Sequence, residues 1–189
     1  MIDEHSSLKD VCFGVSAALE RHGIHAVLTG GSAATVYAPE YYTSLDVDFV
    51  LTNFHGRKEL DAALAEIGYV PSARLGMYEH GRSPFTVDFP KGPLAVGGDY
   101  IHETAVLEKD SLRLRILTVT DCVRDRLSGF YHWNDLTALK AAVGVAKKHR
   151  EKVDFKRLKE WTEREGAPPR DFLTKYDEFL RRVGVIKAR

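Results

Sequence analysis

The chain has few cysteines, which limits how it can be cross-linked. Only two occur among 189 residues, Cys12 and Cys122, and they lie far apart. Because they form no CxxC motif, we expect neither a disulfide framework nor a cysteine zinc site. The eight histidines form no HxH or HExxH pattern of zinc ligands either. A reducing cytoplasm is therefore the expected compartment.

Long apolar runs are also missing. No stretch approaches the roughly 18 residues that a membrane helix needs. The start of the chain, Met1 to His5, is acidic and polar, which argues against a secretory signal or a transit peptide. Apolar residues make up 44% of the chain and charged residues 29%, which excludes disordered and fibrous classes. We expect a globular protein with no membrane partner.

The chain has no net charge, but its charges are unevenly distributed. Residues 1–146 carry 13 basic and 19 acidic side chains, whereas residues 147–189 carry 14 basic and 8 acidic ones. A basic segment can attract polyanions. The basic residues alternate with acids, however, which favours a solvated helical surface whose charges are partly paired.

The order of helical and extended patterns predicts an α+β fold with a small mixed sheet and flanking helices. Helical spacing is found at 6–22, with Ser6 or Ser7 as the N-cap and Gly23 as the stop, and again at 56–67. A short helix is predicted at 32–37. Extended patterns occur at 24–29, 46–51, 69–80, 84–89 and 112–116.

From Thr120 onward the pattern is helical, with four predicted helices. Asp154 is the expected cap of the third, and Pro169 is expected in the first turn of the fourth. We therefore predict an α/β core over residues 1–117, followed by a helical region over residues 118–189 that packs on it.

Two carboxylates share one face of the predicted strand at 46–51. Successive strand residues point to opposite faces, so Asp46 and Asp48 lie together while Val47 and Phe49 face the core. Two such carboxylates, about 7 Å apart along the strand, repel each other unless a cation lies between them. Their oxygen ligands suit Mg²⁺.

A third carboxylate, Asp88, follows Val87 in the extended segment 84–89. If this strand lies beside the strand at 46–51, Asp88 joins Asp46 and Asp48. Three carboxylates with two divalent ions suit in-line phosphoryl transfer, because one ion activates the attacking oxygen and the other neutralises the leaving group.

A glycine turn precedes these carboxylates. Gly30, Gly31 and Ser32 stand between a predicted strand and a predicted helix, a position where backbone N–H groups can bind an anion. The Ser32 hydroxyl can donate to a phosphate oxygen. No Gly-Lys-Ser/Thr follows, so the turn is not a Walker loop.

The pattern of Gly30-Gly31-Ser32, then Asp46-Val47-Asp48, then Asp88 resembles the nucleotidyltransferase superfamily with its polymerase-beta-like fold. The small size resembles bacterial minimal and AbiEii-type toxin nucleotidyltransferases. The segments 118–127 and 131–135 are similar to uncharacterised bacterial members of this group. The resemblance covers roughly residues 24–135, and the C-terminal helices only by type.

This resemblance implies a role for each matching residue. Gly30, Gly31 and Ser32 would hold the triphosphate of an NTP such as ATP. The metal-binding and catalytic residues would be Asp46, Asp48 and Asp88, which would bind two Mg²⁺ ions, with Mn²⁺ as a possible substitute. Asp88 would also help to deprotonate the acceptor hydroxyl. Arg124 and Arg126 would reach the phosphates, although only one of two arginines two residues apart can face a given site. Tyr41 and Tyr42 stand where many relatives carry a basic residue.

The expected activity is transfer of NMP from an NTP to an acceptor hydroxyl with release of pyrophosphate. RNA, a protein side chain and a small molecule all stay open as acceptors. Two alternatives also stay open: a non-catalytic binding member of the same fold with an antitoxin-like protein partner, and a metal-dependent phosphohydrolase. Tyr131 and Trp133 could stack on a base, but aromatic residues at helical spacing more often belong to the core.

Overall fold

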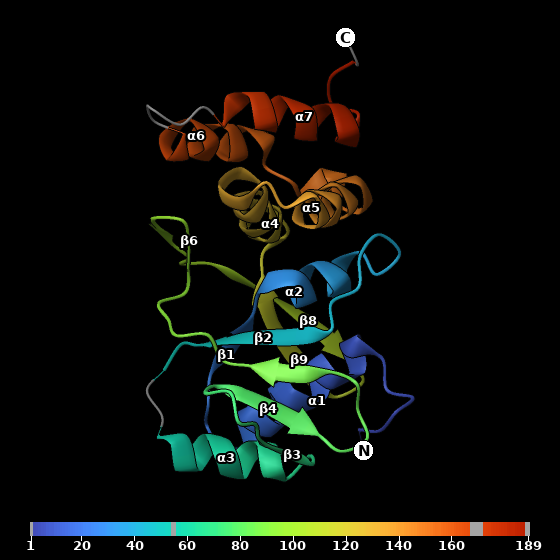
Figure 1. The fold of residues 1–189 in the computed structure, drawn as a ribbon, viewed down its shortest axis with the longest axis vertical. Coiled ribbons are helices and arrows are strands. Elements are labelled where there is room, and N and C mark those ends of the chain that lie inside the picture. Colours follow the sequence, from blue (N-terminus) through green and yellow to red (C-terminus); the bar gives the residue numbers. More distant parts are fainter. Residues whose placement is uncertain (1, 54–55, 167–171, 188–189) are drawn as a thin grey trace.

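One half of the molecule is built around a mixed seven-stranded sheet (Figure 1). The computed structural model describes residues 2–53, 56–166 and 172–187. The order of strands across the sheet is β3-β4-β5-β2-β1-β9-β8. Its members are β1 (Ala26–Leu28), β2 (Asp46–Leu51), β3 (Tyr69–Pro71), β4 (Met77–His80), β5 (Thr86–Asp88), β8 (Thr104–Lys109) and β9 (Leu112–Leu117).

The strand pairing is both parallel and antiparallel, as the sequence predicts. β2 runs antiparallel to β1 and parallel to β5, and β1 runs parallel to β9. β4 pairs antiparallel with both β3 and β5, and β8 pairs antiparallel with β9. The predicted α+β class with a mixed sheet is thereby confirmed.

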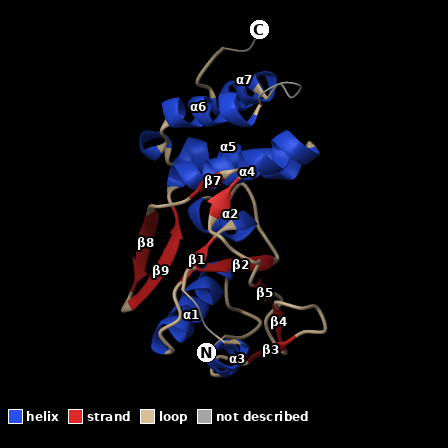
Figure 2. Cartoon of the chain, turned by 90° about the vertical axis from the view of Figure 1, so that its left-hand side faces the viewer, coloured by secondary structure: helices blue, strands red, loops and turns tan. Residues whose placement is uncertain are grey.

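Helices cover the two sides of the sheet differently (Figures 1 and 2). On one side lie α1 (Leu8–Arg21) and α3 (Arg57–Ala65), which contact each other. On the other side lies α2 (Gly30–Tyr37), with α4 (Val119–Trp133) and α5 (Leu136–Lys148) packed on it. The outermost layer holds α6 (Phe155–Glu165) and α7 (Leu173–Val183), after a short 3-10 turn, η1 (Arg150–Lys152).

Helix ends follow the predicted capping chemistry. Ser7 caps α1 by accepting a hydrogen bond from the Asp10 N–H, and the Asp10 side chain accepts one from the Ser7 N–H. Just past the helix, Gly23 has a φ of 67°, a conformation that glycine adopts without strain. Asp154 caps α6 by accepting from the Arg157 N–H. The predicted position of Pro169 lies outside the described residues.

β8 was not predicted from the sequence. This strand has no fully buried side chain and forms an edge of the sheet, so its residues show no strong apolar alternation. The predicted segment 69–80 contains two strands rather than one, separated by a turn in which Gly76 has a φ of 88°. Beyond the sheet, Gly97 and Gly98 form the turn of a small hairpin of β6 (Ala95–Val96) and β7 (Asp99–Tyr100).

One hydrophobic cluster runs through both halves of the molecule. It includes Phe13 and Phe49 beneath the sheet and Phe130, Trp161 and Phe179 among the C-terminal helices, all at most 1% exposed. β9 ends at Leu117, and the regular structure described after it is helical. The division into two domains at this point stays a prediction. None of the described helices combines the length and apolar character that crossing a membrane requires.

Candidate active site

Two of the predicted carboxylates face each other across neighbouring strands. β2 and β5 are parallel, and their register pairs Asp48 with Asp88. One residue earlier, Val47 pairs with Val87, and both are fully buried in the core. Side chains in register on adjacent strands point to the same side, about 4.8 Å apart. The sequence-based expectation that Asp88 lies beside Asp48 is therefore confirmed.

Asp46 lies on the same side of β2 but is engaged differently. Its exposed carboxylate accepts a hydrogen bond of 2.6 Å from the Thr86 hydroxyl, which stands opposite it on β5. Among the residues that the structure describes, no group of three or more His, Cys, Asp or Glu side chains is gathered closely enough to hold a metal ion. The paired carboxylates are therefore Asp48 and Asp88, with Asp46 turned toward Thr86.

The glycine turn lies directly against Asp48. Gly30 begins α2 with a φ of 65°, and a Cβ at this position would overlap the Asp48 carboxylate. The second glycine, Gly31, lies under the Tyr42 ring and the Ser44 hydroxyl, each about 3 Å from where its Cβ would be. Because α2 begins at Gly30, the N–H groups of its first turn have no carbonyl partner within the helix. The turn thus brings backbone donors next to the carboxylate pair.

Ser32 joins the turn to β2. Its hydroxyl donates to the Thr29 carbonyl over 2.8 Å and accepts from the Asp48 backbone N–H over 3.1 Å. The side chain is fully buried. This arrangement makes Ser32 a positioning residue that holds the start of α2 against Asp48. Its predicted role in gripping a triphosphate stays a prediction.

Burial and neighbouring charges perturb Asp48. Removal from water raises the pKa of this carboxyl to about 6, and Asp88 and Asp46 add to the rise because like charges oppose ionisation. Arg126 acts in the opposite direction and favours the ionised form. Asp48 is thus a half-buried carboxylate beside a second carboxylate, a combination typical of functional sites.

Arg126 is the cation whose charge favours the ionised form of Asp48. Its guanidinium donates two hydrogen bonds to a single Asp125 oxygen, over 2.6 and 2.9 Å. Burial acts to lower the pKa of Arg126, but Asp125 and Asp48 outweigh it and the pKa is raised. Asp125, which is not among the residues predicted for the site, orients this arginine through both hydrogen bonds.

Arg124 lies elsewhere. It is only 2% exposed, and it forms ion pairs with Asp121 and Asp99, each over 3.2 Å. Its guanidinium lies 5.8 Å from the centre of the Trp161 ring. This side chain is thus held in the packing between α4 and α6, and of the two arginines Arg126 is the one whose charge acts on the Asp48 pKa. Phosphate binding stays a prediction for both arginines.

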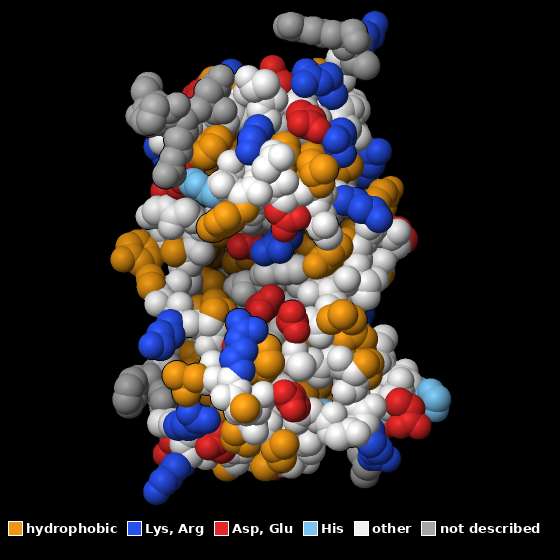
Figure 3. Space-filling model, viewed as in Figure 1, with side chains coloured by type: hydrophobic (Ala, Val, Ile, Leu, Met, Phe, Trp, Pro, Cys, Tyr) orange, Lys and Arg blue, Asp and Glu red, His pale blue; other side chains and the backbone are white. Residues whose placement is uncertain are grey.

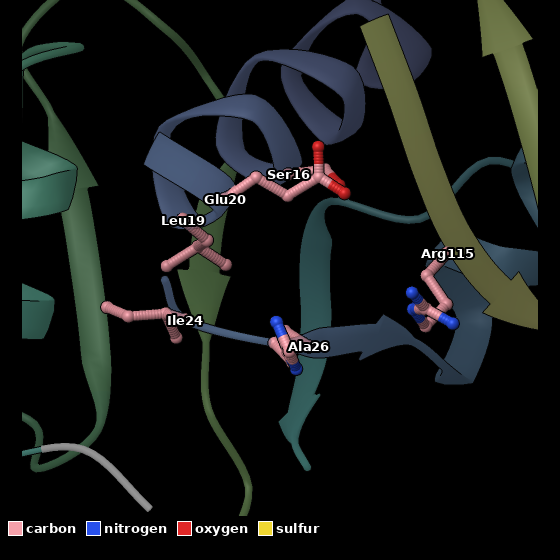
Figure 4. Close-up of a pocket in the computed structure, with 7 residues that line it drawn as sticks. Ser16, Leu19, Glu20, Ile24, Ala26 and Arg115 are labelled. Atoms are coloured by element: carbon pink, nitrogen blue, oxygen red, sulfur yellow. The ribbon is translucent and has the colours of Figure 1, made fainter. Parts of the chain in front are cut away.

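Two pockets differ in their relation to the site. One, of about 210 Å³, is lined by Thr29 at the start of the glycine turn, Asp125, and Leu94 to Val96 next to the β6–β7 turn. It therefore lies beside the start of the glycine turn, although Asp46, Asp48 and Asp88 do not line it. The other lies between α1 and the start of β1, where Glu20 and Arg115 line it (Figure 4). At about 10 Å³ it has room for roughly one water molecule, so it is too small for a substrate.

The two aromatic residues considered for base stacking, Tyr131 and Trp133, differ in burial. Tyr131 is buried and stacks on Trp161 and Phe172, with ring centres 5.5 and 4.9 Å apart. Trp133 is 77% exposed at the end of α4. The core interpretation therefore holds for Tyr131 and fails for Trp133.

The contact between Gly30 and Asp48 makes a testable prediction. In the Gly30→Ala variant we expect the new methyl group to displace the Asp48 carboxylate, so that nucleotide-dependent activity is lost. The Gly23→Ala variant is a matched control, because Gly23 has nearly the same φ but no atom of a described residue within 4 Å of its Cβ position. Both variants carry a backbone penalty of about 1–2 kcal/mol. Equal activity in the two variants at equal stability would contradict the assignment.

The sheet and its covering helices define a nucleotidyltransferase-like fold, as comparison with solved structures shows. An antigenic nucleotidyltransferase-like protein from Paracoccidioides brasiliensis has a TM-score of 0.63 at 14% identity, covering 98% of this chain and 96% of that one. The antibiotic-resistance factor ANT(2″)-Ia has a TM-score of 0.53 at 14% identity, over 94% and 97% of the two chains. Its complex with adenylyl-2″-tobramycin gives 0.50 at 16% identity, over 89% and 98%. No protein-family model and no curated protein matches the sequence.

Proposed function

We propose that this protein transfers NMP from an NTP to an acceptor hydroxyl and releases pyrophosphate. The observation that supports this proposal is the register pair of Asp48 and Asp88, next to a glycine turn that begins a helix. The nucleotidyltransferase-like fold adds to it. Fold alone does not fix activity, so the proposal depends on the chemistry of the site.

The donor set fits a magnesium ion. Asp48 and Asp88 offer the hard oxygen atoms that Mg²⁺ prefers, and the missing Cβ of Gly30 leaves space for the Asp48 carboxylate. Mg²⁺ in such sites is commonly held by one or two carboxylates together with substrate phosphates and water, so a protein cage of three ligands is not required. Asp46 would complete the set by turning away from Thr86. When bound, the ions would supply charge neutralisation at the triphosphate.

The proposed reaction forms one bond and breaks one. The acceptor oxygen forms a bond to the α-phosphorus of the NTP, and the bond from that phosphorus to the bridging oxygen breaks. Pyrophosphate leaves with the electron pair of that bond. The hydroxyl proton passes to the Asp88 carboxylate and then to solvent, a general-base role.

The remaining residues bind and orient. The N–H groups of Gly30 and Gly31 would donate to triphosphate oxygens, as at other helix N-termini. Arg126, held by Asp125, would attract the same phosphates. Ser32 would act through the backbone of Asp48, which it holds in place. Because Tyr42 lies over Gly31, a bound triphosphate would require its ring to move.

The finer assignments belong to the same proposal. We expect Mg²⁺ dependence, with Mn²⁺ as a substitute, and a cytoplasmic location. An AbiEii-type toxin relationship and an antitoxin-like partner rest on the sequence resemblance alone. A small-molecule acceptor is supported only by analogy, since ANT(2″)-Ia was solved with adenylyl-2″-tobramycin.

A direct test measures nucleotide binding and release of pyrophosphate. We expect one NTP to raise the melting temperature in the presence of Mg²⁺, because ligand binding to the native state stabilises it. Asp88→Asn should lower the rate of transfer by roughly 10²- to 10⁴-fold, the usual contribution of a general base. Glu79→Gln is a matched control, because Glu79 is an exposed carboxylate on the neighbouring β4 that accepts a hydrogen bond from the Ser72 hydroxyl.

Other outcomes would favour the alternatives. Release of phosphate or NMP without any acceptor would indicate a phosphohydrolase. Binding of an NTP or a protein without turnover would indicate a non-catalytic member of the fold. Equal activity in Asp88→Asn and Glu79→Gln would contradict the role of Asp88.

A further inference from the structure

Basic side chains from two separate parts of the sequence meet at one end of the helical region. The C-terminal ends of α5 and α7 lie together there, where Arg150 donates a hydrogen bond of 3.4 Å to the Val183 carbonyl. In Figure 3, Lys and Arg side chains gather at the upper right, over these two helices. We call this the basic surface, and it consists of Lys147, Lys148, Arg150, Lys152, Arg181, Arg182 and Lys187.

Most of these charges are not neutralised. Lys148 pairs with Glu40 and Arg182 with Glu178. Within the described part of the chain, the other lysines of this surface and Arg181 make no hydrogen bond or ion pair with a side chain. On α6, by contrast, acids four residues further on lie close to the lysines, as in Lys156–Glu160 and Lys159–Glu163. The alternation seen in the sequence therefore neutralises α6 but leaves the basic surface with excess positive charge.

The basic surface is connected to the candidate site by the segment 38–45. At one end of this segment Glu40 pairs with Lys148 over 2.9 Å, and the Tyr37 carbonyl lies 3.0 Å from the His149 ring nitrogen. At its other end β2 begins with Asp46. The glycine turn and Tyr37 are the two ends of α2, whose eight residues span about 12 Å. A single strand would thus need roughly two nucleotides to span the distance from the basic surface to the carboxylates.

Two half-buried tyrosines lie along this path. The Tyr41 ring is packed where Gly144 of α5 has no Cβ, and Tyr42 lies over Gly31. Aromatic side chains beside a cationic groove are the usual platform for the bases of a single strand. From the basic surface, the path passes Tyr41, then Tyr42 and the glycine turn, and it ends at the carboxylates.

We propose that the basic surface binds the phosphodiester backbone of an RNA strand whose end reaches Asp48 and Asp88. Charge complementarity selects a polyanion, and the tyrosines select one that carries stackable bases. A terminal ribose would then offer its hydroxyl as the acceptor. This last step rests on the proposed function, whereas RNA binding at the surface does not.

The test is binding of a fluorescein-labelled single-stranded RNA of about 12 nucleotides, within the usual range of site sizes. Fluorescence anisotropy is measured in EDTA without NTP, so that an inactive protein would still bind. We expect the variant Lys147→Glu/Lys152→Glu/Arg181→Glu to bind at least tenfold more weakly. Its slope of log K against log salt should be shallower by about 2, since each phosphate contact on a single strand contributes about 0.7. The Glu79→Gln variant, which changes an exposed carboxylate on β4, should bind as the wild type does.

A second triple variant controls for net charge. Lys58→Glu/Arg74→Glu/Arg113→Glu makes the same charge change at exposed positions on α3, the β3–β4 turn and β9. An equal loss of RNA binding in both triple variants would overturn the proposal. So would absence of RNA binding at low salt, or equally tight binding of a polyglutamate peptide of similar charge, which would assign the surface to an acidic protein. NTP-dependent transfer to a small molecule without RNA binding would overturn this inference alone, whereas RNA binding without transfer would count only against the proposed activity.

Discussion

The Asp48→Asn variant is expected to be inactive in nucleotide transfer and yet more stable than the wild type when no metal is present. The half-buried Asp48 carboxyl has a pKa of about 6, raised by burial and by the neighbouring carboxylates. Asparagine has nearly the same shape and carries no charge to bury. Because the Asp48 side chain makes no hydrogen bond within the described residues, the replacement breaks none there.

The effect should depend on pH in a defined direction. The Asp48 carboxyl has a raised pKa in the folded state. Below about pH 4 it is protonated in both the folded and the unfolded protein, so it costs folding no free energy there. As pH rises from about 4 to about 6, the unfolded chain loses the proton while the folded protein still holds it, so stability falls, and the loss is complete above about pH 6. A rise of about 2 in pKa corresponds to roughly 3 kcal/mol at most, which we expect as the advantage of the variant near pH 8.

Urea unfolding in EDTA at pH 4.5 and at pH 8 measures this difference. Asp46→Asn is the matched control, because that carboxylate is exposed and already accepts a hydrogen bond from Thr86. We expect a smaller gain in stability for it at pH 8, because the Asp46 charge contributes only part of the rise in the Asp48 pKa and burial contributes most. If Asp48→Asn has the wild-type free energy of unfolding at both pH values, the carboxylate is not destabilising. Turnover at the wild-type rate in the Asp48→Asn variant would contradict the assignment of Asp48 to the metal site.

The second large effect is expected at Arg124. Replacing it by methionine should destabilise the protein by about 3–5 kcal/mol, because it leaves the charge of the fully buried Asp121 with a single ion-pair partner, Arg157. Within the described residues, Arg124 donates a hydrogen bond to Asp99, whereas its ion pair with Asp121 Oδ1 is not an aligned hydrogen bond. This loss is a large part of the 5–15 kcal/mol that holds a typical protein folded.

A double variant separates the charge from the packing. Arg124→Met/Asp121→Asn removes both charges, so we expect it to recover much of the stability that Arg124→Met loses. Arg164→Ala is the control: it removes an exposed partner of Asp99 and should cost no more than about 1 kcal/mol. Thermal or urea unfolding measures all three. A loss as large in the double variant as in Arg124→Met would show that the packing on Trp161, rather than the ion pair, stabilises α4 against α6.

The two arginines show the limit of prediction from the sequence. Their spacing implied that only one could face the site, but nothing in the sequence distinguished Arg126 from Arg124. The choice depends on α6, whose Trp161 covers Arg124, and on Asp99, which comes from a hairpin. Asp125 and Tyr42 were passed over as site residues for a similar reason, since their contacts with Arg126 and Gly31 come from side-chain packing.

Much of the local structure of this protein could be predicted from the sequence alone. The alternation of Val47 and Phe49 with Asp46 and Asp48 assigned the two faces of β2, and Ser7 and Asp154 marked helix starts, because periodicity and capping involve residues only a few positions apart. Tertiary structure alone decided which distant elements meet. It placed Asp88 opposite Asp48, turned Asp46 toward Thr86, and joined the ends of α5 and α7 into one basic surface. The physical reason is that strand register and helix packing are set by the burial of the whole core, which no local pattern records.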